Sequence, residues 1–331
     1  MKNFTWQDGE RLVVFRPGAL RDAPDLLRRN GWEEFDLLST PRALDQAPHE
    51  LQAVGSCHNV PHGPVPEAAH AIMGTVRGGV IVALGGGRVI DTAKAIAAAH
   101  GGRVCAIPTT LSGAEMTATH RLPPGHEGRP RVRPALVLAD PEAMTGLPEA
   151  GLRASAMNAL AHGAEPLYTP FANPVAEMAA LRGAGLLSGA LDQDRGERDR
   201  AALALGAILC AYALDSAGYA LHHVLCQTLV RVCGTPHAET NAAVLPLSME
   251  AMRARALDAI SSLAGALGTP PERISDRIET LAGGRLRLGE LGADRDLLDQ
   301  VVEAASQRPE LARTPDPPSG AELSAILESA W

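Results

Sequence analysis

Aromatic side chains are scarce in this sequence, and no apolar run is long enough to span a membrane. Ten of the 331 residues are Phe, Tyr or Trp, and the formal net charge is −8. This composition argues against a nucleic-acid groove, which needs stacking rings and basic side chains. The longest apolar stretch, residues 201–214, falls short of the roughly 18 residues of a membrane helix and has the length of a buried core helix. We therefore expect neither nucleic acid nor a membrane as a partner.

The sequence also lacks a cysteine pair and contains few lysines. The five cysteines form no CxxC pair and are odd in number, and the first residues, MKNFTW, lack the apolar stretch of a secretion signal. Both features are typical of a cytoplasmic protein with reduced thiols. Only two of the 30 basic residues are lysines, Lys2 and Lys94. Lys94 therefore stands out from an arginine-rich background and draws attention to its neighbours.

The order of the expected elements divides the chain into two halves. Short runs rich in Val, Ile and Leu alternate with helix-length segments up to about residue 141, and long Ala- and Leu-rich segments follow. We expect an α/β Rossmann-like domain with a parallel sheet over residues 1–148 and an all-α domain over 149–331. The expected strands cover residues 12–15, 36–38, 80–84, 104–107 and 135–139. The helices expected in the second half cover 152–167, 174–187, 200–216, 220–232, 251–266, 271–282 and 321–331.

Three consecutive glycines at positions 85–87 join a buried strand to a helix. Glycine lets the backbone approach a ligand without a Cβ in the way, and the unpaired N–H groups at the start of the helix favour a phosphate. Arg88, Asp91 and Lys94 follow in that helix. The segment predicts a pyrophosphate cradle, although it is not the G-x-G-x-x-G fingerprint. A tight turn without a ligand is the alternative.

Hydroxyl side chains follow the next strand. Thr109, Thr110, Ser112 and Thr117 come after residues 104–107, with Glu115 among them. In a parallel sheet this places them at the carboxyl edge, where ligands bind. The alternative is a helix start with Ser112 as N-cap and Glu115 closing a capping box. Both interpretations can hold together.

Three histidines lie on apolar segments of the second half. His162 follows Asn158 by four residues, so the two share one helix face. His223 and His237 come from two later segments. Imidazole suits metal binding or proton transfer, and three of them favour a site over ordinary hydrogen-bonded core histidines. A further cluster consists of Cys57, His58 and His62. No other residue follows at a spacing that would complete a metal site, so we interpret the three as incidental loop residues.

Taken in order, these segments resemble the iron-containing alcohol dehydrogenase superfamily. The glycine loop with Asp91 and Lys94, the run IPTTLSGAE at 107–115, Asp140 with the following proline, and the histidine segments carry the resemblance. Within the superfamily, five stretches look like maleylacetate reductases, namely IPTTLSGAEMT, MNALAH, ANPV, LHHVLC and TPHAE. The resemblance runs from about residue 4 to the C-terminus and is loose over 191–200 and 276–310.

The resemblance implies the dehydroquinate synthase-like fold, in which a nicotinamide-binding domain precedes a helical domain, usually in a homodimer. It places the pyrophosphate on the glycine loop and the nicotinamide near Thr109, Thr110 and the loop after Asp140. The reaction implied is the NAD(P)H-dependent reduction of 2-maleylacetate to 3-oxoadipate in the degradation of aromatic compounds. The residues expected to contact the cofactor are Ser39, Thr40, Gly85, Gly86, Gly87, Arg88, Asp91, Thr109, Thr110, Ser112, Thr117 and Thr145.

Asn158 bears on metal binding. Metal-dependent members of the superfamily carry an aspartate at this position, which binds iron or zinc together with three histidines. A neutral amide is a poorer ligand for a divalent ion, and the maleylacetate reductases, generally regarded as metal-free, look like this chain here. We therefore expect no metal. If one is present, His162, His223 and His237 would hold it.

The implied substrate also explains how a metal can be dispensed with. Maleylacetate has a C=C bond conjugated to a ketone, so hydride can add at carbon while charge spreads into an enolate. Hydrogen-bond donors and a protonated imidazole can stabilise that enolate. Because the substrate is a dicarboxylate and the protein is acidic, a local basic pocket is needed. We expect protonated histidines to supply it, helped by Lys94 or an arginine, and the expected catalytic residues are Asn158, His162, His223, His237 and Lys94.

Cofactor choice and three rival functions stay open at this point. The strand over 36–38 ends at Ser39 and Thr40 without a carboxylate that would reject NADP, so we expect NADH with NADPH tolerated. A metal-dependent alcohol or polyol dehydrogenase would have to tolerate Asn158. A carbon–oxygen lyase of the same fold would need more lysines and acidic ligands around the histidines. A non-enzymatic relative would not bind NAD(P)H.

Overall fold

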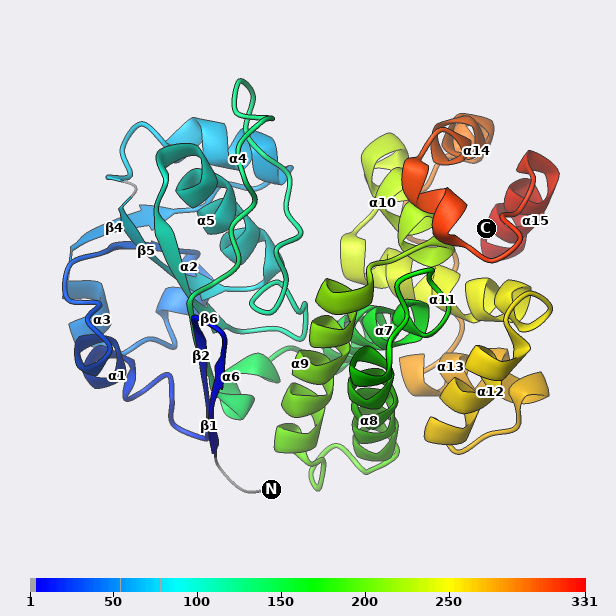
Figure 1. The fold of residues 1–331 in the computed structure, drawn as a ribbon, viewed down its shortest axis with the longest axis horizontal. Helices are drawn as coiled ribbons and strands as arrows, with labels where there is room; N and C mark the ends of the chain where they lie inside the picture. The colour runs from blue at the N-terminus through cyan, green and yellow to red at the C-terminus, as the bar shows by residue number, and fades with distance from the viewer. Residues whose placement is uncertain (1–3, 54, 78) are drawn as a thin grey trace. The chain divides into compact units, whose positions relative to one another are not determined.

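Figure 1 shows the chain as a computed structural model, which describes residues 4–53, 55–77 and 79–331. The chain forms two compact units, Met1–Gly146 and Leu147–Trp331. The boundary expected after residue 148 lies two residues beyond the observed one. The first unit is α/β and the second is helical, which confirms the predicted fold class.

A seven-stranded sheet forms the centre of the first unit. Its strands lie in the order β1 (Phe4–Asp8), β2 (Arg11–Phe15), β7 (Leu136–Ala139), β6 (Arg103–Pro108), β5 (Val80–Gly85), β3 (Asp36–Ser39) and β4 (Ser56–Asn59). All pairs from β2 onward are parallel, as predicted, whereas β1 pairs antiparallel with β2. β1 and β4 are not predicted from the sequence, because both are short and rich in polar residues.

Two apolar layers cover the two faces of this sheet. Side chains alternate along a strand, so Val82 and Leu84 join one layer with Leu27, while Ile81 joins the other with Ile96. The first layer includes residues of α1 (Ala23–Arg29), α2 (Pro41–Leu44), α3 (His49–Ala53) and α6 (Pro141–Met144). The second includes residues of α4 (Val65–Ile72) and α5 (Gly87–His100). Burial on both faces explains the near-continuous apolar strands of the sequence.

Helices alone make up the described second unit. The α-helices are α7 (Glu149–Ala164), α8 (Pro174–Leu191), α9 (Arg200–Ala217), α10 (Leu221–Cys233), α11 (His237–Arg253), α12 (Leu257–Ala266), α13 (Ile274–Ala282), α14 (Leu298–Ser306) and α15 (Gly320–Ala330). Short 3₁₀ turns are η1 (Glu165–Leu167), η2 (Pro271–Arg273), η3 (Arg295–Leu297) and η4 (Pro309–Arg313). Side-chain hydrogen bonds cap the first turns of several of these α-helices. Asn173 and Asp199 accept N–H groups at the starts of α8 and α9, and Ser319 and Glu322 form a capping box on α15.

Glycines bring α8 and α9 into close contact. A Cβ on Gly183 would lie 2.6 Å from Sγ of Cys210, and one on Gly206 would lie 2.9 Å from the carbonyl oxygen of Gly183. Only glycine permits this approach of two helix backbones. Among the described helices, α9 alone is long and apolar enough to cross a membrane, and 61% of it is buried. It packs against α7 and α8, as the predicted core helix should.

The helical unit departs from the prediction around α11. The single helix predicted over 251–266 is wrong, because α11 ends at Arg253 and α12 begins at Leu257. Most of α11 is not predicted, since it contains Pro246, a residue that usually ends a helix. Helix α14 is likewise not predicted; it lies in the stretch where the family resemblance is loose.

Candidate cofactor and active sites

The glycine loop of the first unit is too crowded for larger residues. Gly85 is the last residue of β5, and a Cβ on it would lie 2.7 Å from Cγ2 of Val89. A Cβ on Gly86 would lie 3.0 Å from Cγ2 of Thr110. A side chain at either position would therefore push α5 or the hydroxyl loop, residues 109–117, out of place.

The start of α5 has the properties of a phosphate site. The helix has no side-chain cap, so its first N–H groups are left for a ligand, and its dipole favours an anion. Oγ1 of Thr110 is buried and has no hydrogen-bond partner among the described residues. A Cβ on Gly87 would lie 3.1 Å from the side chain of Ser112. These features fit the pyrophosphate of a dinucleotide, and the cofactor residues predicted here stay predictions.

The hydroxyl loop lies beside the glycine loop, as predicted. The N–H of Thr109 donates to the carbonyl of Gly85 at 3.0 Å, because both loops leave the carboxyl ends of paired parallel strands. The capping box is wrong, since no helix begins at Ser112 in this described segment. Glu115 is instead fully buried, and neither carboxylate oxygen has a hydrogen-bond partner among the described residues. Burial raises the pKa of Glu115 to about 7.

Lys94 requires a correction. Its ammonium is fully buried and donates to the carbonyl oxygens of Ala114, Thr117 and Thr119 at 2.9, 2.9 and 3.1 Å. It also forms an ion pair with Asp91 at 2.7 Å. An ammonium has three N–H donors, so none remains for a substrate. Lys94 therefore fastens α5 to the hydroxyl loop, and this geometry contradicts its predicted catalytic role.

Other predicted cofactor residues use their hydroxyl groups inside the first unit. Oγ of Ser39 is buried and donates to a backbone carbonyl of β5 at 2.8 Å. Oγ1 of Thr145 donates to the carbonyl of Pro141 at 2.7 Å. Thr40 caps α2, and Thr117 lies against the ammonium described above. Because these hydroxyl groups already form hydrogen bonds within the unit, they are less available to a cofactor than the sequence predicts.

Arg88 and the cluster interpreted as incidental have separate surroundings. Nη1 of Arg88, in the first turn of α5, lies 3.0 Å from Nδ1 of His62. His58 instead pairs with Asp36 at 3.0 Å, and Cys57 is exposed. The three residues therefore form no common site, although His62 borders the glycine loop through Arg88.

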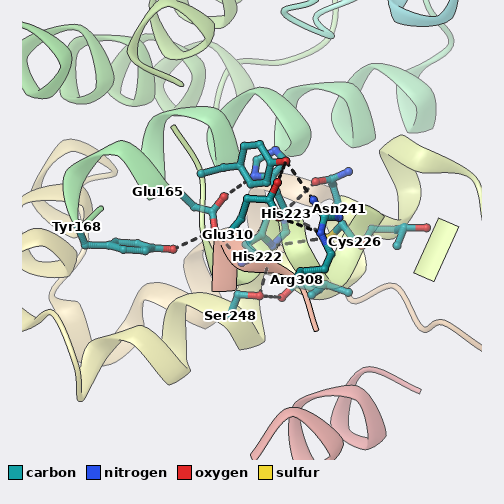
Figure 2. Close-up of polar contacts among 12 residues, drawn as sticks. Glu165, Tyr168, His222, His223, Cys226, Asn241, Ser248, Arg308 and Glu310 are labelled. Atoms are coloured by element: carbon teal, nitrogen blue, oxygen red, sulfur yellow. Dashed lines mark hydrogen bonds and ion pairs between the residues drawn. The ribbon is translucent and has the colours of Figure 1, made fainter. Parts of the chain in front are cut away.

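His223, one of the three predicted histidines, lies with His222 on α10 in a cluster of polar side chains (Figure 2). The rings of His162 and His223 stack with 5.0 Å between centroids and 12° between planes. The ring of His222 meets His223 edge-on at 5.2 Å. His237 begins α11, where Nδ2 of Asn241 lies 3.4 Å from its Nε2. Segments far apart in the sequence thus converge at one place.

A carboxylate that is not predicted as a site residue, Glu165, lies at the centre of this cluster. Glu165 is fully buried at the end of α7, with Oε2 2.5 Å from Nδ1 of His223. Its Oε1 accepts the backbone N–H of His222 at 2.7 Å and the Tyr168 hydroxyl at 3.4 Å (Figure 2). Nε2 of His223 is buried without a hydrogen-bond partner among the described residues. The signal in the sequence is a carboxylate three residues after His162 in an apolar stretch.

Burial favours the neutral forms of these groups. Loss of hydration, reinforced by neighbouring imidazoles, lowers the pKa of His222 and of His223 to about 3, and lowers the pKa of His162 well below its ordinary value. Burial also raises the pKa of Glu165. These directions favour a hydrogen bond between a protonated carboxyl and a neutral imidazole over an ion pair of Glu165 with His223. Burial likewise lowers the pKa of His237, so these directions contradict the prediction that protonated His162, His223 and His237 form a basic pocket.

Arginine supplies the charge beside the cluster. The ring of Tyr219 lies 5.6 Å from that of His223, and its hydroxyl donates to Oε1 of Glu310 at 3.2 Å. Nη2 of Arg308 donates to the same hydroxyl at 3.0 Å, and Nε of Arg308 donates to Glu310 at 3.2 Å (Figure 2). A guanidinium stays charged at any working pH. Positive charge near His223 therefore comes from Arg308, the residue that precedes η4.

Comparison with known proteins assigns the family. The family described as "Iron-containing alcohol dehydrogenase" matches residues 11–141, and "Fe-containing alcohol dehydrogenase family, C-terminal" matches residues 153–331. The chain belongs to the iron-containing alcohol dehydrogenase family. This confirms the predicted family, and the protein is an oxidoreductase.

Within the family, the chain is similar to maleylacetate reductases over nearly its whole length. Maleylacetate reductase 1 of Rhodococcus opacus is 32% identical, over 99% of this chain and 96% of that protein. The maleylacetate reductase of Burkholderia cepacia is 32% identical, over 96% of this chain and 95% of that protein. The crystal structure of maleylacetate reductase from Agrobacterium tumefaciens is 30% identical, covers 100% of this chain and 99% of that chain, and superposes with a TM-score of 0.85.

The donors that could hold iron in this family member do not converge on one point. No three His, Cys, Asp or Glu side chains within residues 4–53, 55–77 and 79–331 are placed to hold a metal ion. The rings of His162 and His223 are stacked, and Nδ1 of His223 is taken by Glu165, which leaves Nε2 as its available nitrogen. Asn158 adds only a neutral amide. The described residues thus form no complete donor set, and the expected lack of a metal stays a prediction.

Proposed function

We propose that this oxidoreductase reduces 2-maleylacetate to 3-oxoadipate with a nicotinamide dinucleotide. The observation that carries the proposal is the buried Glu165–His223 pair, which leaves Nε2 for a substrate in a site without a convergent metal donor set. Similarity to maleylacetate reductases along almost the entire chain supports the choice of substrate.

The glycine loop and α5 supply the cofactor site of the proposal. N–H groups at the start of α5 and Oγ1 of Thr110 would bind the pyrophosphate. When bound, the dinucleotide would supply a hydride to the conjugated double bond. No carboxylate stands at Ser39 or Thr40 after β3, so we propose NADH with NADPH tolerated.

The Glu165–His223 pair would supply the proton. Hydride addition to the C=C bond leaves an enolate, whose carbon must accept a proton. In the proposed step Glu165 starts as the protonated acid: His223 gives up the proton on Nε2 and takes the Glu165 proton at Nδ1, so that the imidazole ends neutral and Glu165 becomes a carboxylate. The N–H of His222 and the Tyr168 hydroxyl, both already directed at Glu165, stabilise that carboxylate.

Turnover on freshly generated maleylacetate tests the proposal. NADH consumption is followed for untreated protein and for protein after exhaustive chelation, with elemental analysis of both samples. Turnover that survives chelation on metal-free protein is the expected result. No turnover on maleylacetate, together with bound zinc or iron and activity on alcohols that chelation abolishes, would assign the chain to the metal-dependent dehydrogenases.

We also propose the setting of this reaction. A reductase of maleylacetate acts in the breakdown of aromatic compounds, and the reduced cysteines suit the cytoplasm. The homodimer implied by the family resemblance is tested by sedimentation equilibrium. A dimer has twice the 34.6 kDa mass of one chain, and a species of single-chain mass at micromolar concentration contradicts it.

A further inference from the structure

Two guanidinium groups flank the tyrosine beside the histidine cluster. Arg308 precedes η4, and its Cζ lies 6.0 Å from the centroid of the Tyr219 ring. Arg313 is the last residue of η4, and its Cζ lies 5.9 Å from the same centroid. The same ring lies 5.6 Å from the ring of His223. Both guanidinium groups therefore lie against the same tyrosine ring that lies against His223, the proposed proton donor.

The two arginines differ in their partners. Arg308 is committed to Glu310 and to the Tyr219 hydroxyl, and its charge is balanced by that carboxylate. Arg313 lies over Phe171 at 5.6 Å and over Tyr219 at 5.9 Å, and no ion pair with a carboxylate is formed by it among the described residues. Stacking on aromatic faces leaves the in-plane N–H donors of a guanidinium for a planar anion.

The backbone is shaped around Arg313. Gly218 ends α9 with a φ of +73°, and a Cβ there would lie 3.2 Å from Nη1 of Arg313 and 4.0 Å from Cδ2 of Phe171. The left-handed conformation favours glycine, and the missing side chain makes room for the guanidinium against Tyr219. Arg313 is thus held beside the cluster with an uncompensated charge.

We propose that Arg313 binds a carboxylate of the substrate and selects dicarboxylates over monocarboxylates. The inference rests on the proposed function, since it assigns the recognition of a dianion at the same site. A substrate whose reacting carbon lies beside His223 extends its far carboxylate past Tyr219, where Arg313 offers two parallel N–H donors. Arg308 acts as a positioning residue that holds Tyr219 through its hydroxyl.

Binding of two six-carbon acids tests this assignment independently of turnover. Calorimetric titration compares adipate with hexanoate on the full chain, for wild type, Arg313→Gln, Arg313→Lys and Arg182→Gln. Arg182 is an exposed arginine of α8 and controls for the loss of one positive charge. We expect Arg313→Gln to weaken adipate binding by about 10- to 100-fold and to leave hexanoate and NADH binding unchanged. Arg313→Lys should recover part of the loss, and Arg182→Gln should behave as wild type.

The outcomes separate this inference from the proposed function. Equal adipate affinity in wild type and Arg313→Gln overturns the role of Arg313, even if maleylacetate is reduced. Preference for adipate that is lost in Arg313→Gln upholds the dicarboxylate site, even if maleylacetate itself is not turned over. A wild-type protein that binds adipate no better than hexanoate overturns the inference. A purely structural role for Arg313 would weaken both acids together.

Discussion

Glu165 is the residue on which the proposed proton transfer depends. In Glu165→Gln the amide keeps the size of the side chain but has no acidic proton to pass to Nδ1 of His223. We expect kcat to fall by roughly 10- to 100-fold with little change in the KM for NADH. The pH dependence of kcat should also change, because an ionisable group of the proposed proton relay is removed. Steady-state rates across pH, with circular dichroism to confirm folding, check this.

The matched control removes a weaker contact to the same carboxylate. Tyr168→Phe deletes only the 3.4 Å hydrogen bond to Oε1 of Glu165 and should keep most of the activity and the shape of the pH profile. Wild-type kcat in Glu165→Gln would rule out this carboxylate as the proton source.

Glu115 gives the stability of the first unit a pH dependence of definite sign. Its pKa rises from 4.5 in the unfolded chain to about 7 when buried. Between these values the folded state holds a proton that the unfolded state has lost, so this group's contribution to stability falls as pH rises through the window. Glu115→Gln removes the ionisable group. Relative to the wild type, the free energy of unfolding of Glu115→Gln should increase by on the order of 3 kcal/mol between about pH 4 and about pH 8.

Urea unfolding at the two pH values measures that difference. Glu290→Gln, at an exposed carboxylate of the second unit, should show no comparable change. A stability difference between wild type and Glu115→Gln that is the same at both pH values would contradict the expectation.

At the scale of elements, the strand-to-helix junction at the glycine loop should be intolerant of a single methyl group. In Gly85→Ala the new Cβ would meet Val89 of α5 at 2.7 Å, so α5 must move away from the loop. Because the start of α5 is the proposed phosphate site, the Kd for NADH should rise by at least about 10-fold. Fluorescence titration with NADH measures it.

Gly74 provides the comparison for that substitution. A Cβ on Gly74 meets no atom within 4 Å, so Gly74→Ala should bind NADH as wild type does. Unchanged NADH affinity in Gly85→Ala would contradict a role for this junction in cofactor binding.

Elements with a strong internal pattern can be predicted from this sequence, and those fixed by distant contacts cannot. The parallel strands β2, β3, β5, β6 and β7 are apolar because both sheet faces are covered. In contrast, α11 forms despite Pro246, since its buried side chains pack against α7 and α10. The edge strand β1 depends on its partner β2 rather than on its own composition.

The same distinction applies to the site. Spacing reveals the three predicted histidines, but the role of Lys94 depends on backbone carbonyls 20 to 25 residues away. Glu165 becomes notable only when α10 places His223 beside it, 58 residues later in the chain. Protonation follows from burial in the folded unit, so the sequence alone wrongly suggests charged imidazoles.

At the scale of the whole molecule, cofactor binding should raise resistance to unfolding. A ligand that binds only the folded state stabilises it by about 2.7 kcal/mol when present at 100 times its Kd. Adding NADH should therefore raise the melting temperature of wild type, and Gly85→Ala should lose this response at the same NADH concentration. Scanning calorimetry measures both. An NADH-independent melting temperature in the wild type would contradict a dinucleotide site.

The Lys94 ammonium also has a consequence for slow motions of the first unit. It ties three carbonyls of residues 114–119 to the middle of α5, and a buried ammonium cannot leave those partners one at a time without a large desolvation cost. The segment and the helix should open together, as one cooperative unit in native-state hydrogen exchange. Amides over 114–119 should then share the protection of α5, although most of this segment has no regular secondary structure of its own.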